Sequence, residues 1–109
     1  MCRALKVLCV TDGRERLAEV KRAVVAADWE LCEGATTTTE AADQLDAERP
    51  HVLIALGPFD ELVASARKRF PALRIVTDRE LPGSDAVTAS LPQLRDIVRT
   101  TSPPRGPVR

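Results

Sequence analysis

The side chains best placed for chemistry follow four short apolar runs of the chain. These runs end at Thr11-Asp12-Gly13, Leu56-Gly57-Pro58, Thr77-Asp78 and Ala89-Ser90. A cation such as Mg²⁺ needs several oxygen ligands, so Asp12 by itself would make a poor metal site. A position in a turn or at the start of a helix explains Asp12 beside Gly13 more simply.

The most apolar stretch, HVLIALGPF at residues 51–59, offers no side chain suited to catalysis at its carboxyl end. After His51 no ionisable group occurs until Asp60, which we expect to begin a helix and to cap its free amides. His51 lies at the opposite, amino end without a Ser or Cys partner and is interpreted as structural. The chain contains no GxxxxGKS/T, no GxGxxG and no metal-spaced set of Cys and His. We therefore expect no enzyme, no cofactor and no metal.

Composition excludes several classes of partner. At 109 residues, with 16 basic and 16 acidic side chains, the chain is one domain with a formal net charge of +0, so no overall field favours nucleic acid or a membrane. One Trp, two Phe and no Tyr make a stacking surface for single-stranded nucleic acid improbable. Cys2, Cys9 and Cys32 form no CxxC pair, and no apolar stretch is long enough to span a membrane. A cytoplasmic protein is expected.

Hydrophobic spacing divides the chain into alternating strands and helices. Leu17, Val20 and Val24 recur at helical spacing, and the Thr36–Thr39 run followed by Glu40 is typical of a capped helix start. The predicted strands are residues 4–10, 29–35, 51–57, 73–77 and 85–89. The predicted helices are residues 14–28, a segment from the Thr run to just before Pro50, 59–70 and 91–99.

Three basic residues, Arg67, Lys68 and Arg69, close the third predicted helix. Because the apolar residues of this helix, such as Val63 and Ala66, fall on another face, we expect the basic triplet to face solvent and to complement the helix dipole. The triplet is interpreted as a solvated surface and not as a nucleic-acid patch.

The alternation of strands and helices predicts a parallel sheet with helices on both faces. Ligands of such sheets gather at the carboxyl ends of the strands. The last residues, 101–109, are rich in proline and are expected to form a disordered tail after a domain at residues 1–100.

The segments KVLCVTDG, ERPHVLIAL, RIVT, GSDAV and LPQLRDIV resemble, in this order, the receiver domain of bacterial two-component response regulators. The resemblance covers residues 4–100. It implies a flavodoxin-like, receiver-like (βα)5 three-layer sandwich whose parallel sheet has the order 2-1-3-4-5.

Receivers accept a phosphoryl group on an Asp at the end of the third strand, with an acidic pair for Mg²⁺, a hydroxyl and a Lys around it. The resemblance places these roles on residues that mostly lack the chemistry. The acidic pair falls on Thr11 and Asp12, and the acceptor falls on Leu56, or on Gly57 if the register is shifted by one. The hydroxyl falls on Thr77, and the Lys falls on Ser90. The chain therefore resembles a pseudo-receiver that lacks its phospho-acceptor.

The family also places a full helix between the fourth and fifth strands. Here only DRELPG, residues 78–83, intervenes, and its Pro-Gly pair predicts that the fourth helix is missing or reduced to a loop. We expect the sheet around Ile75 and Val87 to lose its helix cover, so that either a loop or another chain must fill the gap. Apolar surface that stays exposed usually marks an interface.

These features predict a phosphorylation-independent signalling module that binds a protein partner or a second copy of itself, with no nucleic acid and no membrane involved. The expected contact face consists of strand 4, strand 5 and the family's helix 5, predicted at residues 91–99. Candidate contact residues are Arg79, Glu80, Leu81, Val87, Leu91, Leu94 and Arg95. Leu81 could equally fill the space of the missing helix. The alternative function is a small-molecule or nucleotide binder at the carboxyl edge of the sheet.

Overall fold

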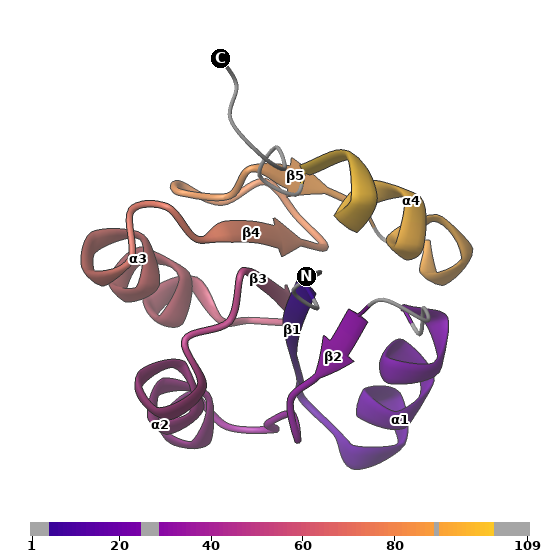
Figure 1. Ribbon diagram of the computed structural model, residues 1–109, viewed down its shortest axis with the longest axis horizontal. Coiled ribbons are helices and arrows are strands. Elements are labelled where there is room, and N and C mark those ends of the chain that lie inside the picture. The colour runs from indigo at the N-terminus through magenta and orange to yellow at the C-terminus, as the bar shows by residue number, and fades with distance from the viewer. Residues whose placement is uncertain (1–4, 25–28, 89, 102–109) are drawn as a thin grey trace, which may run out of the picture.

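The computed structural model describes residues 5–24, 29–88 and 90–101 and contains a five-stranded parallel sheet with the order β2-β1-β3-β4-β5 (Figure 1). The elements, in chain order, are β1 (Leu5–Thr11), α1 (Arg14–Ala23), β2 (Trp29–Leu31), α2 (Thr38–Glu48), β3 (Val52–Leu56), α3 (Asp60–Arg69), β4 (Arg74–Thr77), β5 (Ala86–Val87) and α4 (Leu91–Thr101). The predicted fold and strand order are confirmed.

Successive side chains along each strand point to opposite faces of the sheet and pack into two separate core layers. Leu53 and Ile75 point to the side of the sheet covered by α2 and α3, whereas Ile54 and Val76 point to the side covered by α1 and α4 (Figure 1). Every residue of β3 is buried, as expected for a central strand with helices on both faces. The result is the predicted three-layer sandwich.

Helix α2 begins where the Thr run predicts a cap. The Thr37 side chain accepts a hydrogen bond from the Glu40 N–H (3.1 Å), and Glu40 Oε1 accepts one from the Thr36 N–H (3.2 Å). The helix ends at Arg49, whose φ of 51° is left-handed, just before Pro50. Side-chain capping thus fixes the start of α2, and the reversal at Arg49 sends the chain into β3.

Some element bounds differ from the prediction. β2 has three residues, followed by an isolated bridge between Val10 and Ala35, and β5 has only two. Helix α4 continues through Thr101, the first residue of the predicted tail. The predicted end of the first helix, Ala89 of the fifth strand, Cys2 and residues 102–109 lie outside the described residues.

The chain has no helix between β4 and β5, because residues 78–85 form turns instead. The prediction of a reduced fourth helix is confirmed. Of the two covers expected for Ile75, a loop or another chain, the structure has the loop, since Ile75 is fully buried and Leu81 of the loop packs against the same core cluster. Val87 remains 44% exposed, so the loop covers β4 but not the outer part of β5.

Two free thiols, Cys9 and Cys32, are buried in opposite core layers. Loss of hydration raises the pKa of Cys9 from 9.0 to about 12 and also raises the pKa of Cys32. The folded chain favours the protonated Cys9 thiol. The contribution of this thiol to the free energy of unfolding is therefore fully present below pH 9.0 and is lost as the pH rises toward about 12.

We expect iodoacetamide to label neither Cys9 nor Cys32 in the folded chain at mildly alkaline pH, and to label both in urea. Mass spectrometry of digested samples checks this, with labelling in urea as the control for intrinsic reactivity. Rapid labelling of Cys9 in the folded chain would contradict its burial.

No helix among residues 5–24, 29–88 and 90–101 is both long and apolar enough to cross a membrane.

Candidate functional site

The ends of β1, β3 and β4 bring the predicted site residues to one edge of the sheet. Thr11 is the register partner of Leu56, and Thr77 is the partner of Ala55 directly before it. Asp12 lies beside Gly57, because a Cβ placed on Gly57 would be 3.8 Å from the Cβ of Asp12. The structure therefore brings these positions together at the carboxyl ends of three neighbouring strands.

The two hydroxyl groups at this edge are both used within their own turns. Thr11 Oγ1 donates a hydrogen bond to the carbonyl O of Gly13 (2.8 Å), and Thr77 Oγ1 donates one to that of Arg79 (2.5 Å). Both threonine residues are fully buried. Their hydroxyl hydrogens stabilise the chain as it leaves each strand and do not point to a shared ligand.

The two candidates for the acceptor position are Leu56, which has an aliphatic side chain, and Gly57, which has none. Leu56 is 3% exposed and belongs to the core layer under α1 and α4. Gly57 has a φ of 129°, and a Cβ there would lie 3.1 Å from the ring of Phe59, so a side chain at this position would be strained. Asp60 is exposed in the first turn of α3, as predicted. No carboxylate replaces Leu56 at the end of β3.

The position of the Lys is occupied by the turn that leads into α4. The Ser90 N–H donates a hydrogen bond to Thr88 Oγ1 (3.1 Å), and the Ser90 carbonyl O accepts one from the Gln93 N–H (3.1 Å). Within the described ranges, no group of three or more His, Cys, Asp or Glu residues could hold a metal ion. Ser90 itself carries no positive charge that could stabilise a phosphoryl group.

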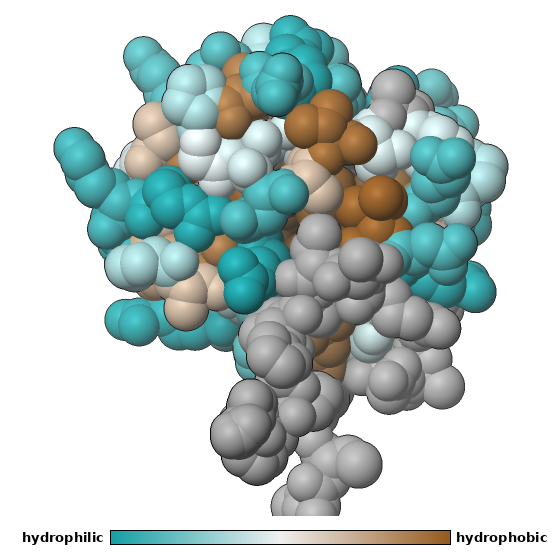
Figure 2. Space-filling view, turned by 90° about the horizontal axis from the view of Figure 1, so that it is seen from above, coloured by the Kyte–Doolittle hydropathy of each residue, from teal (hydrophilic) through white to brown (hydrophobic). Residues whose placement is uncertain are grey.

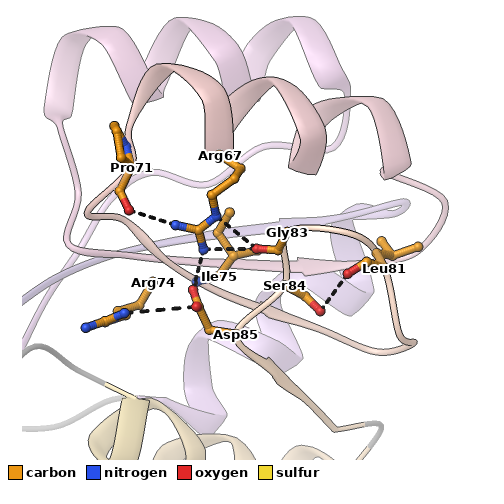
Figure 3. Close-up of polar contacts among 8 residues, drawn as sticks. All are labelled: Arg67, Pro71, Arg74, Ile75, Leu81, Gly83, Ser84 and Asp85. Carbon is orange, nitrogen blue, oxygen red and sulfur yellow. Dashed lines mark hydrogen bonds and ion pairs between the residues drawn. The ribbon is translucent and has the colours of Figure 1, made fainter.

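A second candidate site is the loop of residues 78–85, which Arg67 holds against α3 (Figure 3). Arg67 Nε and Nη2 both donate to the carbonyl O of Gly83 (3.1 and 2.9 Å), and Nη1 donates to that of Pro71 (2.8 Å). Nη2 also pairs with Asp85 Oδ2 at 2.5 Å. One guanidinium therefore joins the end of α3 to both the loop and the start of β5.

Asp85 extends this network into the sheet. Its Oδ2 accepts a hydrogen bond from the Ile75 N–H (2.9 Å), while Oδ1 lies 4.0 Å from Arg74 Nη1. Within the loop, Ser84 Oγ and the Ser84 N–H donate to the carbonyl O of Leu81 (3.0 and 3.1 Å). These bonds fix the loop that joins β4 to β5.

The expectation that all three basic residues of α3 face solvent is wrong for Arg67, whose side chain is 28% exposed. Arg67 and Asp85, which hold the loop in place, are the residues of this candidate site that the sequence interpretation missed. The signal was weak, since nothing in the triplet distinguishes Arg67 from its neighbours. Only the GSD turn, with a Gly carbonyl and a carboxylate close together, indicates a partner for a guanidinium.

The candidate contact residues divide into exposed and buried groups. Arg79, Glu80 and Arg95 are exposed, and Arg79 Nε lies 3.2 Å from Asp78 Oδ1. Leu81 is partly buried against the core, which fits the alternative that it fills the vacated space. The prediction that Leu94 is a contact residue is wrong, because its side chain is 1% exposed and packs from α4 into the core. The side chain of Leu91 lies outside the described part of the chain.

Apolar surface remains on this side of the molecule. Figure 2 shows hydrophobic side chains gathered between polar ones on the side that carries β5 and α4. Among the described residues, Val87 is the large hydrophobic residue that is exposed.

Several solved structures with a similar fold are receiver domains of response regulators. The chain is similar to a CheY-like response regulator receiver domain protein from Methanospirillum hungatei JF-1, with 19% identity, a TM-score of 0.75 and 89% of this chain and 92% of that chain covered. It is also similar to the response regulator domain of Thermotoga maritima CheB, with 17% identity, a TM-score of 0.78 and coverage of 91% and 96%.

A third similar structure is HP1043, an orphan response regulator of H. pylori, with 9% identity, a TM-score of 0.75 and coverage of 92% and 98%. No family model matches the sequence, and no curated protein matches it. At these identities the likeness establishes the receiver fold.

Proposed function

We propose that this chain is a phosphorylation-independent, receiver-like signalling module of the two-component type that acts by binding protein and not by catalysis. The observation that carries the proposal is Leu56, a buried aliphatic side chain at the place of the phospho-acceptor. The hydroxyls of Thr11 and Thr77, which close their own turns, and Ser90 at the Lys position support it.

The binding surface that we propose consists of β4, the loop at 78–85, β5 and α4. Val87 is its apolar centre, and Arg79, Glu80 and Arg95 form a charged rim. Since Arg67 and Asp85 fix the loop, the surface is held in one conformation without a phosphorylation step. The partner is another protein or a second copy of the chain. Free thiols at Cys9 and Cys32 fit a reducing cytoplasm, where we place the protein.

The alternative of a nucleotide site at the carboxyl edge receives less support. A pocket of about 320 Å³ next to β2 is lined by Glu33, Glu40 and Asp43 together with one cation, Arg14. Carboxylates would repel the phosphates of a nucleotide, so the charge of this pocket disfavours such a ligand.

Light scattering of the purified chain, combined with affinity capture from the source organism, tests the proposed surface. We expect a dimer or one reproducible complex that Val87→Glu disrupts, because a charge at the centre of an apolar contact stays unpaired on binding. Ala47→Glu, at an exposed position of α2, is the matched control and should leave binding unchanged. A monomer without a captured partner, or equal binding by both variants, would contradict the proposal.

A further inference from the structure

A pocket of about 370 Å³ opens at the amino edge of the sheet, opposite the degenerate phosphorylation site. It lies where α2 leads into β3 and α3 leads into β4. Its walls are mainly apolar and include Pro50, Phe70, Pro71 and Leu73. This volume falls in the range of small-molecule sites, which are commonly apolar with a few polar groups.

The charged side chains in this lining are all cationic. The guanidinium carbons of Arg49 and Arg69 lie 5.6 and 5.2 Å from the centroid of the Phe70 ring. Arg69 forms an ion pair with Asp46, and no carboxylate lines the pocket itself. Because Asp46 offsets the charge of Arg69, the local positive charge at this ring is that of Arg49, in a chain whose formal net charge is +0.

The backbone of Arg49 is strained. Its φ of 51° and ψ of 58° place it in the left-handed region at the end of α2, where Gly or Asn is favoured. A non-glycine residue in this conformation is a reason to look for a role of its side chain. Here the strained residue brings its guanidinium over Phe70, and both residues line the pocket.

His51 adds a fixed hydrogen-bond donor. Its Nδ1 accepts a hydrogen bond from the Lys6 N–H (3.0 Å), so the neutral ring carries its hydrogen on Nε2. The His51 N–H also donates to the Lys6 carbonyl O (2.9 Å), and its own carbonyl O accepts from the Arg74 N–H (3.1 Å). This side of the pocket is thus anchored to the first residues of the sheet.

We propose that this pocket binds a small aromatic carboxylate. The ring of the ligand packs against Pro50, Phe70 and Leu73, and its carboxylate accepts hydrogen bonds from the guanidinium groups of Arg49 and Arg69. Guanidinium matches a carboxylate in charge and in planar, two-pronged geometry. The site is separate from the binding surface proposed above, and neither depends on the other.

A ¹H–¹⁵N NMR titration of the full chain with 2-naphthoate tests the inference. We expect saturable chemical-shift changes confined to residues 49–51 and 69–74. The neutral 2-naphthamide should bind at least about tenfold more weakly, because it lacks the charge. Shifts that never saturate, that lie elsewhere, or that are equal with the amide would overturn the inference.

Two arginine variants separate the role of Arg49 from net charge. Arg49→Gly suits the left-handed backbone, so the chain should stay folded while 2-naphthoate binding weakens about tenfold. Arg16→Ala removes the same charge from an exposed position of α1 and should bind as tightly as the wild type. Unchanged binding by Arg49→Gly, or equal losses in both variants, would also overturn the inference.

Discussion

Replacing Leu56 with Asp is expected to lower the free energy of unfolding by about 4 kcal/mol, from lost apolar burial and the placement of a carboxyl group in a core. Leu56 is 3% exposed, and its register partner Thr11 donates its hydroxyl to Gly13 and not to β3. No cation lies at the Ser90 position to offset the new charge. Urea unfolding followed by circular dichroism measures the change.

Leu56→Met is the matched control, because it keeps the volume and the apolar character and should cost less than about 1.5 kcal/mol. A Leu56→Asp variant that loses less than about 1 kcal/mol would mean that this edge still tolerates a carboxylate, which would contradict the burial of the site.

Replacing Arg67 with Ala is expected to lower the free energy of unfolding by about 2 kcal/mol, because one substitution removes the donors to Gly83, Pro71 and Asp85 together. The pair with Asp85 is only partly buried, so we expect less than the loss typical of a fully buried pair. Lys68→Ala, at an exposed position of the same helix, should change stability by less than about 0.5 kcal/mol.

The Arg67→Ala substitution should loosen the structure around Ile75 as well as lower the stability of the whole chain. Hydrogen exchange of the Ile75 amide, which donates to Asp85 Oδ2, should quicken in Arg67→Ala more than exchange in β1. A double-mutant cycle with Asp85→Ala should give a coupling energy of about 1 kcal/mol or more. Additive effects, with unchanged exchange at Ile75, would show that the loop does not depend on Arg67.

The parts of the fold that follow from local sequence were predictable. The continuous apolar run of β3 requires cover on both faces, and the pattern of Thr37 and Glu40 fixes the start of α2 by hydrogen bonds between neighbours. The Pro82-Gly83 pair prevents a helix after β4 for the same local reason. The absence of an acidic residue at Leu56 was likewise visible in the sequence.

The features that depend on distant contacts were not predictable. Arg67 finds its acceptors 16 and 18 residues away, so helical spacing alone assigned it to solvent. Ile75 is buried because the loop folds back and brings Leu81 onto the core. The pocket beside Phe70 combines residues from the ends of two helices, which no short motif brings together.

The central claim is that this receiver-like chain takes no phosphoryl group. Incubation of the purified chain with acetyl phosphate and Mg²⁺, followed by intact mass spectrometry, tests it most directly. A receiver domain that retains its acceptor Asp, treated in parallel, is the positive control. We predict that the mass of this chain stays unchanged while the control gains one phosphoryl group, and a gain of one phosphoryl group by this chain would contradict the claim.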